Sequence, residues 1–89
     1  MPRYVIERAM PGVGKMSEAE LAAVSKQSAG ILKELGQGIK WLTSYVTEDK
    51  IYCVYESPSI DLIQVHAKCL GVPATVVSEV HVTIDPPSV

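Results

Sequence analysis

The sequence has little of what marks several common protein classes. Its 89 residues carry 8 Lys and Arg against 10 Asp and Glu, a net charge of -2, and the basic residues are scattered singly. Since no basic stripe is available for phosphates, a nucleic-acid partner is not expected. No run approaches about 18 consecutive apolar residues, so no membrane partner is expected either.

Cysteine is also scarce, and catalytic motifs are missing. Cys53 and Cys69 match no zinc-finger or Cys-x-x-Cys spacing. There is no Ser-His-Asp pattern, and residues 12–15 supply only half of a phosphate-binding loop. The first residues run into an expected strand with no apolar leader, and both thiols are expected to be free. These features predict a cytoplasmic protein.

What the sequence does contain is a regular order of periodicities. The expected elements are a strand at 3–8, a helix behind Ser17, strands at 39–47 and 51–56, a helix opening at Ser57, and a strand at 75–84. This strand and helix order is the split βαβ pattern of the ferredoxin-like α+β fold. A chain of this length has room for one core, so residues 1–89 are expected to form a single domain.

Helix boundaries are indicated by capping residues. Ser17 and Glu20 have the spacing of a capping box, and Gly36 and Gly38 are expected to stop the first helix. Ser57 followed by Pro58 predicts an N-cap with proline at the first helical position. In the second helix, Ile60, Ile63, Ala67 and Leu70 form the apolar stripe, and Gly71 and Pro73 end it.

The two strand–helix–strand crossings predict a four-stranded antiparallel sheet in the order 4-1-3-2, with both helices on one face. Alternation along residues 39–47 puts one set of side chains on each face: Trp41, Thr43 and Tyr45 against Leu42, Ser44 and Val46. The face without helices is expected to be buried against a second copy. The expected assembly is a homodimer through the open sheet face, a dimeric α+β barrel.

Five side chains have metal-ligand chemistry. His66 falls on or beside the inward stripe of the second helix, where the alternative is a core histidine bonded to a carbonyl. Glu79 and His81 share a face of the last strand, either as chelating groups or as a solvated strand edge. Glu7 lies at the end of the first strand, with its face undecided, and could converge with His66 and Cys53 at one end of the sheet. Cys53 is a soft ligand in principle and more commonly a small core residue.

Aromatic residues gather on the two hairpin strands. Trp41, Tyr45, Tyr52 and Tyr55 are explained by cross-strand pairs. The alternative is a stacking platform for a small ring ligand, to which Tyr4 could belong. Tyr4, Trp41 and Tyr52 are therefore the candidate substrate-binding residues.

Several segments resemble a family of small bacterial proteins long known only as a domain of unknown function, which includes a nickel-binding member. They are residues 1–8, Pro11-Gly12, Trp41 with Ser44-Tyr45-Val46, Tyr52-Cys53, His66-Ala67 and residues 71–74. The resemblance implies a ferredoxin-like fold, a homodimer with facing sheets, and nickel binding without established catalysis. Glu7, Cys53 and His66 are its matching positions with ligand chemistry. Val72 stands where a phenylalanine is expected, which implies a reshaped pocket near His66.

Three functions follow. The leading hypothesis is a homodimeric protein that binds nickel or another divalent transition metal and is not an enzyme. The alternative is a monooxygenase-like or isomerase-like enzyme of the dimeric α+β barrel type, with His66 or Glu7 transferring a proton. An apolar cavity beside His66, lined by Tyr4, Trp41 or Tyr52, would favour this enzyme. The third is an interaction module that binds neither metal nor small molecule.

Overall fold

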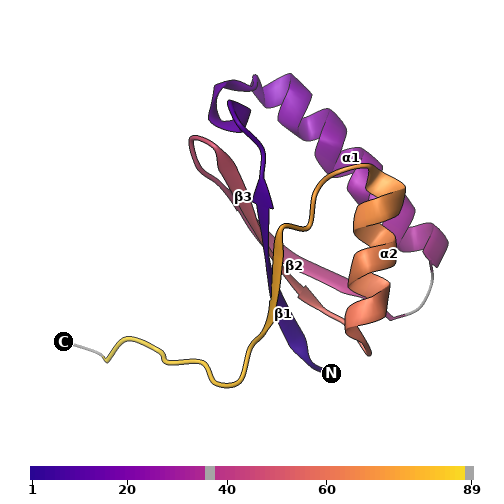
Figure 1. Ribbon diagram of the computed structural model, residues 1–89, viewed down its shortest axis with the longest axis vertical. Helices are drawn as coiled ribbons and strands as arrows, with labels where there is room; N and C mark the ends of the chain where they lie inside the picture. The colour runs from indigo at the N-terminus through magenta and orange to yellow at the C-terminus, as the bar shows by residue number, and fades with distance from the viewer. Residues whose placement is uncertain (36–37, 88–89) are drawn as a thin grey trace.

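The computed structural model describes residues 1–35 and 38–87 of the chain. The elements follow the predicted order (Figure 1): β1 (Arg3–Ala9), α1 (Glu18–Leu35), β2 (Lys40–Val46), β3 (Lys50–Glu56), α2 (Ile60–Leu70) and β4 (Val76–Glu79), with a short 3-10 turn, η1 (Val13–Lys15), before α1. The four strands form one antiparallel sheet in the order β2-β3-β1-β4. This is the predicted order, so the ferredoxin-like α+β fold is confirmed.

Both helices lie on one side of the sheet (Figure 1). On β1, Tyr4, Ile6 and Arg8 are buried toward the helices, whereas the residues between them are less buried. The core is a cluster on this helix face, formed by Tyr4, Ile6, Cys53, Tyr55 and Ile63. Because directly opposite residues of paired strands share a face, this cluster defines the helix face and the open face of every strand.

The capping signals are partly confirmed. The Ser17 N–H donates to Glu20 Oε1 at 3.0 Å, and the Glu20 N–H donates to Ser17 Oγ at 3.1 Å, which is the predicted capping box. The predicted cap of α2 is wrong: Ser59, not Ser57, is the N-cap, and its Oγ accepts from the Leu62 N–H. The Ser57 hydroxyl instead donates to the Ser59 carbonyl at 2.7 Å, which holds the turn before the helix.

Glycines act at the helix ends and at one close approach. Gly71 ends α2 as predicted, in the left-handed conformation with φ of +75°. The predicted stop of α1 at Gly36 lies outside the described residues, and Gly38 has φ of +81°. Gly14 packs against the β2–β3 turn, where a Cβ would lie 2.7 Å from the Thr47 carbonyl oxygen. This glycine is therefore explained by packing rather than by phosphate binding.

The predicted alternation of β2 is wrong, because the strand contains a β-bulge. Trp41 is opposite Tyr55 and Thr43 is opposite Val54, which leaves Leu42 as the extra residue. Beyond the bulge, Ser44 lies opposite the buried Cys53. Trp41 and Ser44 therefore share the helix face, whereas Thr43 and Tyr45 lie on the open face.

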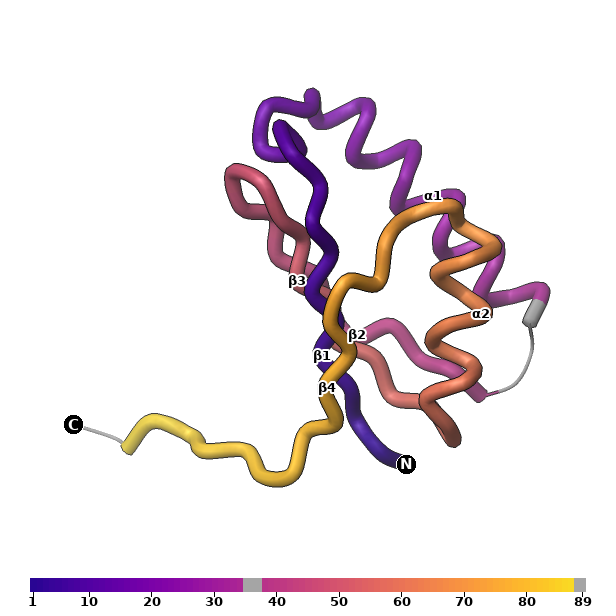
Figure 2. The backbone as a smooth tube through the Cα atoms, in the orientation of Figure 1, coloured from indigo at the N-terminus to yellow at the C-terminus, as the bar shows by residue number. Residues whose placement is uncertain are grey.

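The last strand is shorter than predicted. β4 pairs with β1 from Val76 to Glu79, and one further bond joins the Val80 N–H to the Arg3 carbonyl at 2.8 Å. β1 itself begins at Arg3, so the paired part of the last strand ends beside that residue. Residues 80–87, the C-terminal arm, lead away from the sheet (Figure 2).

Candidate functional site

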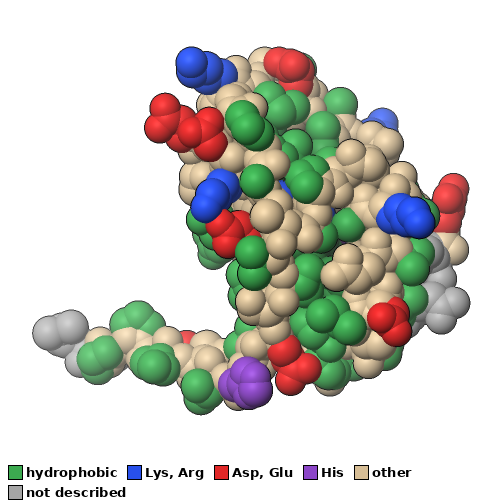
Figure 3. Space-filling view, viewed as in Figure 1, with side chains coloured by type: hydrophobic (Ala, Val, Ile, Leu, Met, Phe, Trp, Pro, Cys, Tyr) green, Lys and Arg blue, Asp and Glu red, His purple; other side chains and the backbone are tan. Residues whose placement is uncertain are grey.

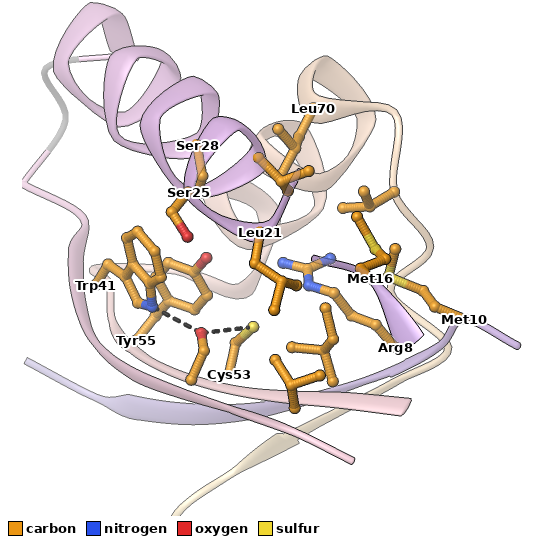
Figure 4. A pocket seen from close by; sticks show the side chains of 15 residues that line it. Arg8, Met10, Met16, Leu21, Ser25, Ser28, Trp41, Cys53, Tyr55 and Leu70 are labelled. Atoms are coloured by element: carbon orange, nitrogen blue, oxygen red, sulfur yellow. Dashed lines mark hydrogen bonds between the residues drawn. The ribbon is translucent and has the colours of Figure 1, made fainter. Parts of the chain in front are cut away.

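An apolar cavity of about 220 Å³ lies between the helix face of the sheet and α1. Figure 4 shows Trp41 and Tyr55 on one side, Met10 and Met16 on the other, and Leu21 between them. β1, β2 and β3 each contribute to its lining, together with α1, Leu70 of α2 and the loop after it. An apolar cavity lined by Trp41 therefore exists, but Tyr4, Tyr52 and His66 do not line it.

Arg8 is the charged group of this cavity, and the sequence analysis missed it. Its side chain is only 2% exposed, and its Nη1 donates to the Pro73 carbonyl at 3.0 Å. Its Nη2 is buried without a hydrogen-bond partner. The sequence did contain a signal, because Arg8 follows Tyr4 and Ile6 at the strand period of two. An arginine at the third inward position indicates a buried polar function.

A chain of hydrogen bonds crosses the floor of the cavity. The indole Nε1 of Trp41 donates to Ser44 Oγ at 2.8 Å, and that hydroxyl donates to Cys53 Sγ at 3.0 Å (Figure 4). The bulge makes this possible by placing Trp41 and Ser44 on one face. The Cys53 thiol is buried and free, whereas Cys69 on α2 is exposed.

His66 lies behind the cavity wall and is fully buried. Its Nε2 is 3.2 Å from Ser28 Oγ, and its Nδ1 is buried without a partner. The Tyr55 ring lies beside it, with 5.4 Å between the ring centroids. Burial, and after it the positive charge of Arg8, holds the pKa of His66 below the usual 6.5. The imidazole is therefore neutral at pH 7, with Nε2 within hydrogen-bond distance of the Ser28 hydroxyl.

Because His66 is buried as a neutral imidazole, the free energy of unfolding should depend on pH. Because the pKa of His66 is lower in the folded chain than in the unfolded one, the unfolded chain takes up a proton first as the pH falls. The stabilisation is complete above about pH 6.5 and is lost as the pH falls through the folded-state pKa. Urea unfolding at pH 7.5, 6.5 and 5.5 should show this loss in the wild type and not in His66→Gln.

The exposed His81 gives the matched control for this experiment. His81→Gln should keep the pH dependence of the wild type, since this side chain is exposed to water in the folded chain and loses no buried surroundings on unfolding. If His66→Gln shows the same slope as the wild type, His66 does not carry the effect.

Tyr55 both lines the cavity and belongs to the core cluster. Its ring stacks against Trp41, with 6.4 Å between centroids, and its hydroxyl points into the cavity (Figure 4). Burial raises the pKa of this hydroxyl, so it remains protonated and available as a hydrogen-bond donor at neutral pH.

Glu7 lies on the open face, because it alternates with the inward-facing Ile6 and Arg8. Its carboxylate forms an ion pair with Lys50, which raises the pKa of that lysine. Glu7 and His66 are therefore on opposite faces of the sheet. The predicted convergence of Glu7, Cys53 and His66 at one end of the sheet does not occur within one chain.

Glu79 and His81 lie on either side of Val80, where the C-terminal arm leaves the sheet. Glu79 is opposite Tyr4, at the outer edge of the helix face. The side chains of Glu79 and His81 are both exposed. Within residues 1–35 and 38–87, no three His, Cys, Asp or Glu side chains are grouped so that they could hold a metal ion. The candidate ligands of a single chain therefore do not form a metal centre. No described helix is long and apolar enough to cross a membrane.

Comparison with known proteins identifies the family. The chain matches the SCO4226-like family, described as nickel responsive protein SCO4226-like, over residues 4–80. The crystal structure of SCO4226 from Streptomyces coelicolor A3(2) has the same fold, with a TM-score of 0.76 and 19% sequence identity, over 92% of this chain and 99% of that chain. Comparison with curated proteins gave no match. The fold and the match over most of its length place this chain in the SCO4226-like family of nickel responsive proteins.

Proposed function

We propose that this chain binds nickel(II) as a homodimer, with the open sheet face as the dimer interface. The name of its family supports nickel as the ion. The observation that carries the proposal is an apolar surface left uncovered on the sheet and on the C-terminal arm. Because the donors of one chain are too dispersed for a metal centre, the second copy is part of the proposal.

The open face carries aliphatic and aromatic side chains on all four strands, with Glu7 between Tyr52 and Val76. Val5, Tyr52 and Val54 cover its middle, and the more exposed Tyr45 and Val76 extend it to the two edge strands. Tyr45 and Tyr52 are direct cross-strand neighbours, so the aromatic surface is held in place by the sheet. A two-fold axis through this face would bury the same surface of both chains.

The exposed C-terminal arm is a separate argument for a second copy of the chain. Val82 and Ile84 are 76% and 87% exposed, although their alternation is typical of a half-buried strand. Figure 3 shows hydrophobic side chains along an arm that stands clear of the domain. Among the described residues the arm pairs with no strand beyond Val80, because β1 begins at Arg3. A second copy supplies apolar surface against which the arm can pack.

The donors best placed for an ion shared between chains are the exposed ones. Glu79 and His81 lie at the base of the arm, and an imidazole with a carboxylate suits nickel(II) among the divalent transition metals. In a dimer each chain would supply its own Glu79 and His81. Glu7 would add a carboxylate from the open face of the sheet, which is the proposed interface. His66 and Cys53 are enclosed on the helix face, and the charge of Arg8 near His66 opposes a cation there.

Calorimetric titration of the metal-stripped protein with nickel(II) tests the proposal, with zinc(II) for comparison. We expect micromolar or tighter binding with a fixed stoichiometry per dimer. The two histidines form a matched pair, since one is exposed and one is buried. His81→Ala should weaken binding by at least about tenfold, as expected for loss of a ligand worth 1.4 kcal/mol or more. His66→Gln should retain binding.

Two results would contradict this assignment. If nickel(II) gives no heat above that of buffer, the protein does not bind the ion and the proposed function is wrong. If only the His66 variant loses binding, the metal site lies on the helix face instead.

A further inference from the structure

The cavity on the helix face carries an inference separate from the metal proposal. The open face and the arm do not contribute to it, and its walls are mainly apolar (Figure 4). Trp41 and Tyr55 give it an aromatic side, and the thioethers of Met10 and Met16 give it an adaptable one. A few polar groups inside an apolar cavity are typical of small-molecule sites.

The guanidinium of Arg8 extends from β1 into this space (Figure 4). It is buried, and among the described residues its one hydrogen bond goes to the neutral carbonyl of Pro73. The described ion pairs lie elsewhere, since Glu7 binds Lys50 and Glu56 binds Arg3, both outside the cavity. No described carboxylate is paired with Arg8, and Nη2 makes no hydrogen bond within the described part of the chain.

A buried, unpaired charge is unfavourable, and arginine cannot relieve it by losing a proton. Most buried charges are paired, because the attraction of a partner offsets the cost of leaving water. The free Nη2 therefore marks a position for an anionic group that the chain itself does not supply. The planar fork of a guanidinium fits a carboxylate by two parallel hydrogen bonds.

The charge of Arg8 and the aromatic side of the cavity restrict the class of ligand that can bind there. Arg8 is the only charged side chain that lines the cavity within the described residues, so a monoanion is neutralised and a dianion such as a phosphate monoester is not. The stacked rings of Trp41 and Tyr55 suit a flat apolar body. The protonated hydroxyl of Tyr55, which points into the same space, is a second donor for the anion.

We propose that this cavity binds a small monocarboxylate with an aromatic or similarly flat apolar body, whose carboxylate pairs with Arg8. The ligand body lies against Trp41 and Tyr55. Ligand binding completes the hydrogen bonding of the buried guanidinium. This site is independent of nickel, because none of its lining residues is a proposed exposed ligand of the metal.

Phenylacetate and the uncharged phenylacetamide, of matched size, are suitable probes for the full-length chain. In calorimetric titrations, the wild type should bind phenylacetate at least tenfold more tightly than phenylacetamide. Arg8→Met keeps the length and apolar character of the side chain and should abolish this preference. Arg3→Met is the matched control, since Arg3 is on the same strand but pairs with Glu56 outside the cavity. It should keep the preference.

Amide chemical shifts of the wild type locate the binding without any variant. On addition of phenylacetate, shifts should change around Arg8, Trp41 and Tyr55, so a poorly folded Arg8→Met would not prevent a decision. Benzoate and 4-methylpentanoate extend the probe series, and phenyl phosphate tests the dianion. The proposal is overturned if no carboxylate of the series binds, if phenylacetamide or phenyl phosphate binds as tightly as phenylacetate, or if the shift changes lie outside the cavity.

Discussion

Replacing Ile63 with alanine is expected to lower the free energy of unfolding by about 2–5 kcal/mol, the range for truncating a large aliphatic core residue. Ile63 is a fully buried residue of α2 and belongs to the core cluster on the helix face of the sheet. Its loss would leave a void within this cluster, which the sheet cannot easily close. Because a domain of this size is marginally stable, a large share of the folded population would be lost.

Ile60 provides the matched control, because it is the same residue type on the same helix but is 43% exposed. Ile60→Ala should cost about 1 kcal/mol or less, since a half-exposed side chain gains less from folding. Urea unfolding at one fixed protein concentration measures both variants, and the fixed concentration matters if the chain self-associates. Equal losses for the two variants would contradict the packing described for α2.

Introducing a charge on the open face should dissociate the proposed homodimer. Val54 lies in the middle of this face, between Val5 on β1 and Thr43 on β2. In Val54→Lys, each chain would bury an ammonium group in the interface, and the two-fold symmetry would impose that cost twice. We expect the dissociation constant of the dimer to rise by at least about 100-fold, which corresponds to roughly 2.8 kcal/mol.

Light scattering after size exclusion, over a dilution series, measures this change. Val65→Lys is the control, because Val65 is also a valine but lies on α2, away from the open face, where it is 43% exposed. It should remain as dimeric as the wild type, and circular dichroism should show both variants folded. A wild type that is monomeric at every concentration, or a Val54→Lys protein that stays dimeric, would rule out this interface.

The fold was predictable because its signals are local and repeated. Several strand residues alternate, helical stripes recur over several turns, and the Ser17–Glu20 box and Gly71 each set a boundary by the chemistry of one or two residues. Ser57 and Ser59 show the limit of this approach. Both serines precede the same helix, and only the backbone position decides which hydroxyl caps it.

The errors lie where one segment depends on a distant one. The end of β4 depends on where β1 begins, and these two strands lie far apart in the sequence. The site was misjudged for a related reason. Glu7 was considered together with His66 because both lie near one end of the sheet, and only the register shows that they are on opposite faces.

The bulge at Leu42 also affects how β2 can be compared with the same strand in related proteins. The bulge shifts the alternation of the strand by one residue. Before it, odd-numbered positions face the helices, and after it, even-numbered positions do. Deleting the extra residue would leave Ser44 and Val46 on the helix face and Tyr45 on the open face, because the pairing with β3 already skips Leu42. A relative that lacks this residue should therefore show one unbroken alternation of inward and outward residues along the whole strand.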